Sequence, residues 1–257
     1  MVRTTWLAVL LGLVAGLAGV PAYGGESVVP PPSGASFDYQ LGGDRSVPDH
    51  VGIVVRDRAG EPEPDLYNVC YVNGFQTQPD ERRFWRRHWR LVLKQDRRPV
   101  RDAAWGEWLL DLRTPTKRRA LARIVGRWVE GCARDGFDSV ELDNLDSFTR
   151  SRHLLVRRHV LAYARLLIRR AHGAGLPVAQ KNLAELDGTT IGFDFAIAEE
   201  CGRWRECGRY AASYGDQVLA VEYRNRDFRR TCRQYGAAWS VVRRDRALTP
   251  RGLRRWC

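Results

Sequence analysis

The sequence lacks several residue types and patterns, and each absence narrows the class of protein. Beyond the first 24 residues, no segment is apolar enough to cross a membrane. There is no C-x-x-C motif and the five histidines are scattered, which argues against a structural zinc site. No set of side chains resembles the ligands of a two-metal phosphodiesterase. We therefore expect neither a metal nor a cofactor.

Lysine is also scarce, although the chain is strongly basic. Of the 42 lysines and arginines only Lys94, Lys117 and Lys181 are lysines, so the net charge of +12 is carried by arginine. Such a surface attracts polyanions. An arginine-rich solvated exterior explains the same composition, because net charge bears on association and solubility rather than on chemistry. The composition therefore predicts no specific nucleic-acid partner.

The N-terminus has the order of features typical of a secretory signal. Arg3 precedes an uncharged run from Trp6 to Val20, and the small residues Ala22 and Gly24 follow. The run of 15 residues is shorter than the roughly 20 that cross a bilayer as a helix. We predict a signal peptide over residues 1–24 that is cleaved on export; an uncleaved anchor is the alternative.

The rest of the chain is expected to be secreted, free of the membrane after signal cleavage, and monomeric. A proline-rich segment at residues 25–36 includes Pro30, Pro31 and Pro32. No linker interrupts residues 37–257, a length that suits one α/β barrel.

Six cysteines agree with an oxidising compartment. Counting cannot settle their pairing. Local spacing favours a disulfide between Cys201 and Cys207, and a Cys232–Cys257 disulfide would tether the C-terminus. Cys70 and Cys132 are equally compatible with free buried thiols.

Short apolar runs alternate with longer amphipathic ones, which predicts a parallel sheet with crossover helices and, at this length, a TIM-type (β/α)8 barrel. Such a barrel needs eight strands, and nine candidates are present. We expect one of the terminal candidates to be additional to the barrel. The candidates are Phe37–Leu41, Val51–Arg56, Asn68–Asn73, Trp108–Leu112, Asp138–Asp143, Pro177–Lys181, Phe193–Ala198, Val218–Tyr223 and Ala238–Arg243.

The helices follow from apolar residues at three- and four-residue steps. One helix begins at Pro115 after Thr114 as N-cap and ends before Gly136. Others are predicted over residues 151–172 and 82–94. The 11 residues between Arg56 and Asn68 contain two prolines and a glycine, so we expect early crossover helices to be replaced by loops.

Catalytic residues of such barrels lie at the carboxyl ends of the strands. The predicted strand ends are rich in acids, which are costly to bury unless they are paired or functional. These positions and their neighbours carry Asp38, Tyr39, Gln40, Tyr71, Asp111, Glu141, Asp143, Asn144, Asp146, Lys181, Asn182, Glu199, Glu200, Glu222 and Tyr223.

The segment at residues 137–146 is the most informative. Alternation along a strand places Glu141 and Asp143 on one face and Val140 and Leu142 on the other. If the apolar pair packs against the helices, both acids lie in the barrel mouth. A buried acid paired with a lysine is the alternative interpretation of either carboxylate.

A second carboxylate comes from the segment that ends at Cys201. Alternation does not decide between Glu199 and Glu200 here, and a glutamate that caps the following helix is the alternative role. Glycoside hydrolysis requires two carboxyl groups across the scissile bond, and acids from distant strand ends can meet in this way.

Several short motifs, taken together, resemble glycoside hydrolase family 114, whose named activity is endo-α-1,4-polygalactosaminidase. The resemblance covers roughly residues 37–243. The motifs are Tyr39–Leu41, Cys70–Tyr71, Trp108–Asp111, Val140–Asn144, Gln180–Asn182, Phe193–Ala196, Glu199–Cys201, Glu206–Cys207 and Glu222–Tyr223.

The resemblance implies that Asp143 is the nucleophile or base and Glu199 the acid/base. It also implies a set of residues that line the sugar subsites, namely Gln40, Asp111, Glu141, Lys181, Asn182 and Tyr223. Leu142 and Ala198 depart from the family pattern, which often has proline and asparagine there.

A partly deacetylated galactosaminan is cationic, so an acidic cleft attracts it at contact distance while the basic exterior repels it. The alternative function is a catalytically inactive secreted barrel that binds polyanionic or carbohydrate polymers. Its best support is the arginine-rich segment Arg82–Arg90 with Trp85 and Trp89, although those aromatics have the spacing of core residues.

Overall fold

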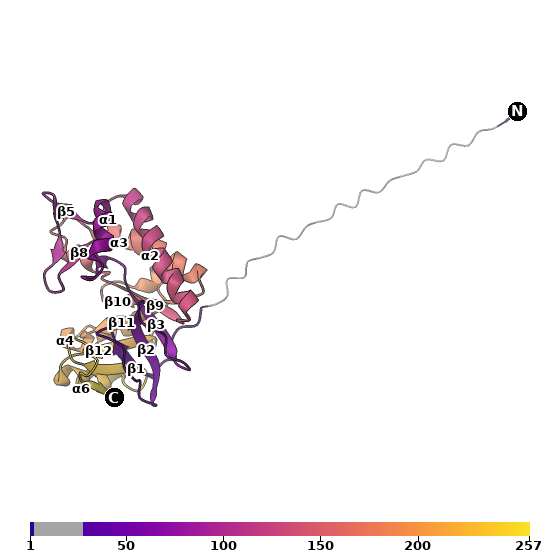
Figure 1. Cartoon of the computed structure of the whole chain (residues 1–257). Helices are drawn as coiled ribbons and strands as arrows, with labels where there is room; N and C mark the ends of the chain where they lie inside the picture. The colour runs from indigo at the N-terminus through magenta and orange to yellow at the C-terminus, as the bar shows by residue number, and fades with distance from the viewer. Residues whose placement is uncertain (3–27) are drawn as a thin grey trace.

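Eight parallel strands form the wall of a barrel in the computed structural model, which describes residues 1–2 and 28–257 (Figure 1). The predicted signal peptide therefore lies almost wholly outside the described residues. Neighbouring strands are hydrogen-bonded in the order β1-β2-β3-β9-β10-β11-β12-β13, which confirms the predicted barrel. Their bounds are Ser36–Gln40, Val51–Asp57, Tyr67–Asn73, Ser139–Asp143, Val178–Lys181, Phe195–Glu199, Val218–Glu222 and Ser240–Arg244.

The barrel is closed between β13 and β1 by a short final strand, β14 (Arg254–Trp256), which pairs antiparallel with β13. The Trp256 indole donates a hydrogen bond of 2.8 Å to the carbonyl of Phe37 in β1. Arg244 and Arg254 both pair with the carboxylate of Asp38 on β1. Side chains thus replace a continuous backbone ladder at this seam.

The predicted strand at residues 108–112 is not part of the barrel. β8 (Glu107–Leu109) instead pairs antiparallel with β7 (Arg101–Asp102) and β4 (Gln76–Thr77) in a separate three-stranded sheet. The tight turn at Gly106, whose φ is 73°, folds β8 back onto β7, so pairing is local. The expectation that the additional strand is terminal was therefore wrong. A two-stranded hairpin of β5 (Lys94–Gln95) and β6 (Arg98–Pro99) lies beside it in sequence.

Helices cover the outside of the barrel unevenly. The segments that join β1 to β2 and β2 to β3 contain no helix, as predicted, and only a 3-10 turn joins β10 to β11. The helices are α1 (Arg82–Arg87), α2 (Pro115–Asp135), α3 (Arg157–Gly173), α4 (Cys201–Trp204), α5 (Cys207–Tyr214) and α6 (Asn225–Tyr235), and the 3-10 helices are η1 (Trp89–Leu91), η2 (Ser147–Arg150) and η3 (Gly188–Ile191).

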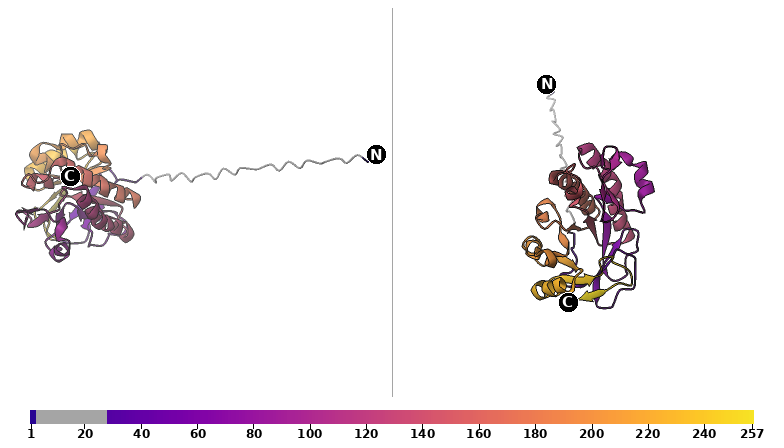
Figure 2. Two further views of the ribbon diagram at one scale, coloured as in Figure 1. Left: turned by 90° about the horizontal axis from the view of Figure 1, so that it is seen from above. Right: turned by 90° about the vertical axis from the view of Figure 1, so that its left-hand side faces the viewer.

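The two long helices, α2 and α3, lie side by side on one flank (Figure 2). Thr114 caps α2 by accepting a hydrogen bond from the Lys117 amide, and Gly136 follows the helix, both as predicted. Gly136 adopts a left-handed φ of 95°. The helix predicted over residues 82–94 is shorter, because Val92 and Leu93 leave it to pair with the strand segment at Leu109 and Leu110.

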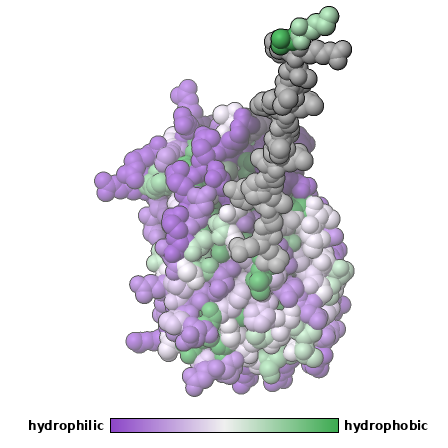
Figure 3. Space-filling model, turned by 90° about the vertical axis from the view of Figure 1, so that its right-hand side faces the viewer, coloured by the Kyte–Doolittle hydropathy of each residue, from purple (hydrophilic) through white to green (hydrophobic). Residues whose placement is uncertain are grey.

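The surface over α2 is largely hydrophilic on the face drawn in Figure 3. Arg119, Arg123 and Arg127 of α2 are exposed, in keeping with an arginine-rich solvated exterior. Within residues 28–257 no helix has both the length and the apolar character that a membrane crossing requires.

Apolar side chains form two layers, one inside the barrel and one between the strands and the helices. Val140 and Leu142 of β9 belong to the outer layer, whereas Glu141 and Asp143 face the inside. The alternation predicted for this strand is confirmed, and it carries carboxylates into the barrel mouth.

Three disulfides connect all six cysteines. Cys201–Cys207 and Cys232–Cys257 are the predicted pairs. Cys70 and Cys132, whose state the sequence left open, form a disulfide that joins β3 to α2.

Replacing both Cys70 and Cys132 with serine should lower the free energy of unfolding by about 2–4 kcal/mol. The sequence separation of 62 residues makes this the longest loop that a disulfide closes here, and long loops restrict the unfolded chain most. Denaturant unfolding of the variant against the parent measures the change. The matched Cys232→Ser/Cys257→Ser variant, with a separation of 25, should lose less; an equal or larger loss would contradict loop length as the cause.

Candidate active site

Two carboxylates from strands separated by one strand approach each other at the barrel mouth. Asp143 ends β9 and Glu199 ends β11, and Lys181 ends β10 between them. Lys181 Nζ lies 3.6 Å from Asp143 Oδ2 and 3.5 Å from Glu199 Oε2. The two carboxylate oxygens can therefore be no farther apart than the sum of these distances, which places both acids within reach of one sugar linkage.

Hydrogen bonds fix the orientation of the Asp143 carboxylate. The Tyr71 hydroxyl donates to Oδ2 at 2.8 Å, and the backbone amide of Asn144 donates to Oδ1 at 2.6 Å. Asn144 adopts a left-handed φ of 70°, which asparagine tolerates better than most residues. Its side chain bonds to Asn73 and Gln76, so this turn is itself anchored.

The Glu199 carboxylate is oriented from two sides. The Tyr223 hydroxyl donates to Oε1, and the Asn182 amide donates to Oε2 at 3.3 Å. The backbone amide of Glu199 in turn donates to Asn182 Oδ1 at 2.9 Å. The side chain is 25% exposed, so a substrate can reach it.

A buried polar layer supports Lys181 from below. Glu141 Oε1 accepts hydrogen bonds from Lys181 Nζ and from the Tyr39 hydroxyl, both at 2.7 Å. Burial alone would lower the pKa of Lys181, but Asp143, Glu141 and Glu199 together hold it well above its usual value. Glu141 is fully buried, so the interpretation as an acid paired with a lysine applies to Glu141 rather than to Asp143.

The site opens into a cleft with two adjoining parts that share Glu199, Tyr223 and Trp105. The acidic part, of about 410 Å³, contains Asp143 and is lined by several further acids. The mixed part, of about 800 Å³, is lined by arginines and glutamates in comparable numbers. The further acids of the acidic part are Asp57, Asp80, Asp102, Glu107 and Asp146, and the charged residues of the mixed part include Arg150, Glu185, Glu200, Arg205, Glu206, Arg209 and Arg246.

Half of the twelve residues predicted for sugar binding border this cleft. Those that line it are Tyr71, Asn144, Asp146, Lys181, Asn182 and Tyr223. Tyr39 and Glu141 lie beneath it, in contact with Lys181.

Four predicted residues lie away from the cleft. Asp38 and Gln40 bond to each other on the outer side of β1 at the barrel seam, because Phe37 and Tyr39 take the inner side. Asp111 lies outside the barrel and pairs with Arg113 at 2.8 Å and with Lys117.

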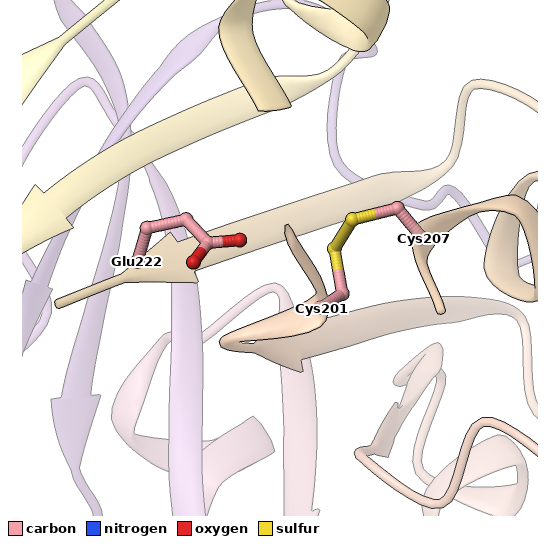
Figure 4. Close-up of side chains that lie close together, drawn as sticks. All are labelled: Cys201, Cys207 and Glu222. Atoms are coloured by element: carbon pink, nitrogen blue, oxygen red, sulfur yellow. A yellow bond between two sulfur atoms is a disulfide. The ribbon is translucent and has the colours of Figure 1, made fainter. Parts of the chain in front are cut away.

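Glu222, the fourth, faces the helices because Tyr223 faces the cleft. Its carboxylate accepts a hydrogen bond of 2.6 Å from the Gly202 amide and one of 3.0 Å from Thr231, beside the Cys201–Cys207 disulfide (Figure 4). Within the described residues these two cysteines and Glu222 are the one set placed closely enough to share a metal ion. The sulfur atoms are bonded to each other, so the set offers no thiolate, and the residues do not fit a metal.

The structure separates Glu199 from its neighbour. Glu200 has a left-handed φ of 57° and its carboxylate pairs with Arg203 at 2.9 Å and Arg246 at 3.0 Å. It makes no side-chain cap to α4. Its charge is thus neutralised by arginines, whereas Glu199 faces Asp143 across Lys181.

Sequence reasoning missed cleft residues on loops and on the small sheet. Glu107 lines the acidic part, and burial raises its pKa to about 7. Arg150 pairs with Asp102 at 2.8 Å and with Asp146 at 2.8 Å. The antiparallel hairpin around Gly106 carries Glu107 to the cleft, and only the glycine turn signal in the sequence pointed to it.

A barrel whose mouth brings together two carboxylates from β9 and β11 has the arrangement that glycoside hydrolysis requires. The chain belongs to glycoside hydrolase family GH114, whose family model matches residues 20–257. The predicted family is therefore confirmed. No curated protein sequence matches the chain.

Solved structures share the fold. Ega3 of Aspergillus fumigatus, in complex with galactosamine, is 18% identical with a TM-score of 0.72, over 90% of this chain and 99% of that chain. The glycoside hydrolase domain of PelA from Pseudomonas aeruginosa is 18% identical with a TM-score of 0.55, over 85% and 96%. The α-galactosidase TtGalA from Thermus thermophilus is 14% identical with a TM-score of 0.51, over 83% and 58%. At these identities the likeness concerns the fold.

Proposed function

We propose that this protein is a secreted, endo-acting glycoside hydrolase that cleaves α-1,4-linked, galactosamine-containing polysaccharide. The observation that carries the proposal is the arrangement of Asp143 and Glu199 around the ammonium group of Lys181. Family membership supplies the reaction class, and two oriented carboxylates supply the chemistry that glycoside hydrolysis needs.

In this mechanism Asp143 is the nucleophile or base and Glu199 the acid/base. The hydrogen bond from Tyr71 aims the Asp143 carboxylate, and the Lys181 ammonium group lies 3.6 Å from it, so the carboxylate is placed to stabilise positive charge that develops on the sugar ring. Glu199 accepts a hydrogen bond from the Tyr223 hydroxyl, which orients its carboxyl group. As general acid, Glu199 donates its own carboxyl proton to the leaving oxygen. Lys181 is a positioning residue, held by Glu141 and Tyr39.

The acidic part of the cleft supports a cationic sugar as substrate. A galactosamine unit with a free amine carries a positive charge, and Asp57, Asp80 and Asp102 line this part together with Asp143. The bound ligand of Ega3 is galactosamine, a cationic sugar of the kind proposed here. Contact between the amine and nearby carboxylates outweighs the long-range repulsion by the arginine-rich exterior, which salt screens.

Export is supported by the three disulfides, which form and persist in oxidising compartments. We propose that the partner is the polysaccharide itself and that the protein acts as a monomer without a membrane anchor after cleavage of residues 1–24.

The test is to incubate the purified protein with α-1,4-galactosaminans of graded acetylation and to separate the products by size. We expect release of oligosaccharides of several lengths, faster from polymers with more free amine. Chitosan, which is cationic but β-linked, is the matched control and should stay intact. Absence of oligosaccharide release from every galactosaminan would refute the proposal, and cleavage of chitosan would refute the linkage.

A further inference from the structure

Two tryptophans are exposed in the cleft. Trp105 is 58% exposed and Trp204 is 61% exposed. Among the phenylalanines, tyrosines and tryptophans of residues 28–257 they are the only exposed side chains, and both line the mixed part of the cleft. Exposed aromatic surface of this size is unfavourable in water, and its concentration in a cleft indicates a binding role.

Both side chains are carried on turns that are fixed by independent contacts. In the turn that carries Trp105, the Ala104 amide donates to Asp102 Oδ1 at 3.0 Å and the Gly106 amide donates to the Asp102 carbonyl at 2.9 Å. The Asp102 carboxylate is further held by Arg150 at 2.8 Å. The Trp105 backbone is therefore ordered before a ligand arrives, which lowers the entropic cost of binding.

Trp204 is fixed by the disulfide that follows Glu199 and by the arginine beside it. It ends α4, which begins at Cys201 and is linked by the disulfide to Cys207 at the start of α5. The Arg203 guanidinium lies 4.6 Å from the centre of the Trp204 ring. One side of the indole is thus supported, and the high exposure shows that the remainder is accessible.

The positions of the two rings relative to the carboxylates differ. Trp105 borders both parts of the cleft, next to the site of bond cleavage, whereas Trp204 borders only the mixed part. The mixed part, about 800 Å³ in volume, has room for more than one sugar unit. A chain that is bound at the carboxylates can therefore continue past Trp105 toward Trp204.

A galacto-configured sugar suits such rings. Its axial oxygen at C4, which carries the glycosidic bond inside a 1,4-linked chain, leaves the hydrogens of C3, C4 and C5 together on the opposite side, and this apolar patch packs flat on an indole. The remaining hydroxyls and the amine then point away from the ring, where the charged residues that line the same part of the cleft, Asp146, Glu185 and Arg209 among them, can bind them.

We propose that Trp105 and Trp204 are stacking platforms for two separate sugar units of one bound polymer chain. The inference rests on the proposed function and deepens it, because it assigns binding residues on one side of the scissile bond. Trp105 holds a unit close to the carboxylates, and Trp204 holds a unit that only a longer chain reaches.

The test measures binding of α-1,4-galactosamine oligomers of two to eight units by calorimetry, on a Glu199→Gln background that prevents turnover. Trp204→Ala should weaken binding of the longest oligomer about tenfold and leave the dimer within about twofold. Trp105→Ala should weaken binding of both by about tenfold. Trp204→Phe should restore most of the loss, since the benzene ring still stacks.

Leu253→Ala is the matched control, because Leu253 is an exposed apolar side chain (40%) outside the cleft, and it should not change binding. Parental affinity at every length in both alanine variants would overturn the platforms while leaving the proposed hydrolysis intact. If the Glu199→Gln protein with both tryptophans binds no oligomer of any length, the proposed substrate class and the stacking platforms are both refuted. In that case the parent protein should also release no oligosaccharide in the hydrolysis assay.

Discussion

Asp143→Asn should reduce kcat on the natural polymer by roughly 10⁴-fold, the scale seen when a catalytic group of this kind is removed. The amide has nearly the same shape, and its one oxygen can accept the bond from the Asn144 amide while its NH2 group donates to the Tyr71 hydroxyl oxygen, but it carries no charge to stabilise or attack the sugar. The fold should be retained because the buried Lys181 ammonium group, which loses one anionic neighbour, keeps Glu141 and Glu199 as partners. Initial rates of oligosaccharide release and thermal unfolding measure the two effects.

Asp80→Asn is the control for Asp143→Asn. Asp80 is an exposed acid that lines the acidic part of the cleft, so its removal weakens attraction for a cationic sugar without touching the carboxylate pair. We expect a change of a few-fold, mainly in KM. Retained turnover in Asp143→Asn with unchanged unfolding would end the assignment, and a large drop in Tm would instead favour a structural role for the carboxylate.

Glu199→Gln should lower the rate of polymer hydrolysis by roughly 10³-fold or more, but retain much of the activity on an aryl glycoside. A good leaving group needs little protonation, so loss of the proton donor costs less on that substrate. Both substrates are assayed between about pH 4 and about pH 8. The acid/base role predicts that the ratio of aryl to polymer activity rises sharply in this variant.

Glu200→Gln is the adjacent control and should be mild. Its carboxylate is already paired with Arg203 and Arg246, so its loss removes a partly screened ion-pair network worth about 1 kcal/mol of stability rather than a proton donor. If Glu200→Gln is the inactive variant and Glu199→Gln keeps polymer hydrolysis over the whole pH range, the two roles are exchanged.

The residues on the inner face of β9 could be predicted because side chains alternate along a strand. Val140 and Leu142 are apolar and pack against the helices, so Glu141 and Asp143 must face the inside of the barrel. The same rule, applied to each strand end, would have separated Tyr223 from Glu222 and Tyr39 from Asp38. Adjacent residues on a strand cannot both face the cleft, and a list of polar residues at strand ends ignores this. Alternation could not rank Glu199 above Glu200, since the backbone leaves extended geometry at Glu200.

Long-range pairing was beyond the sequence pattern. The apolar run at residues 108–112 has the composition of a barrel strand, and its antiparallel pairing depends on a local turn at Gly106, which brings β7 beside it, and on β4, which lies well before it in the sequence. The cleft loops were missed for a related reason. Trp105 and Trp204 show no periodicity, and only exposure in the folded chain distinguishes them from core tryptophans.

The near-absence of lysine has a practical consequence for coupling chemistry. Reagents that attack amines find three side chains, and Lys181 is 2% exposed under the carboxylate pair. Lys94 and Lys117 both lie outside the cleft linings, and burial together with the charge of nearby Lys117 lowers the pKa of Lys94. Amine coupling through these side chains to a solid support should therefore hold the enzyme by a single flank and leave the whole polymer path open to solution.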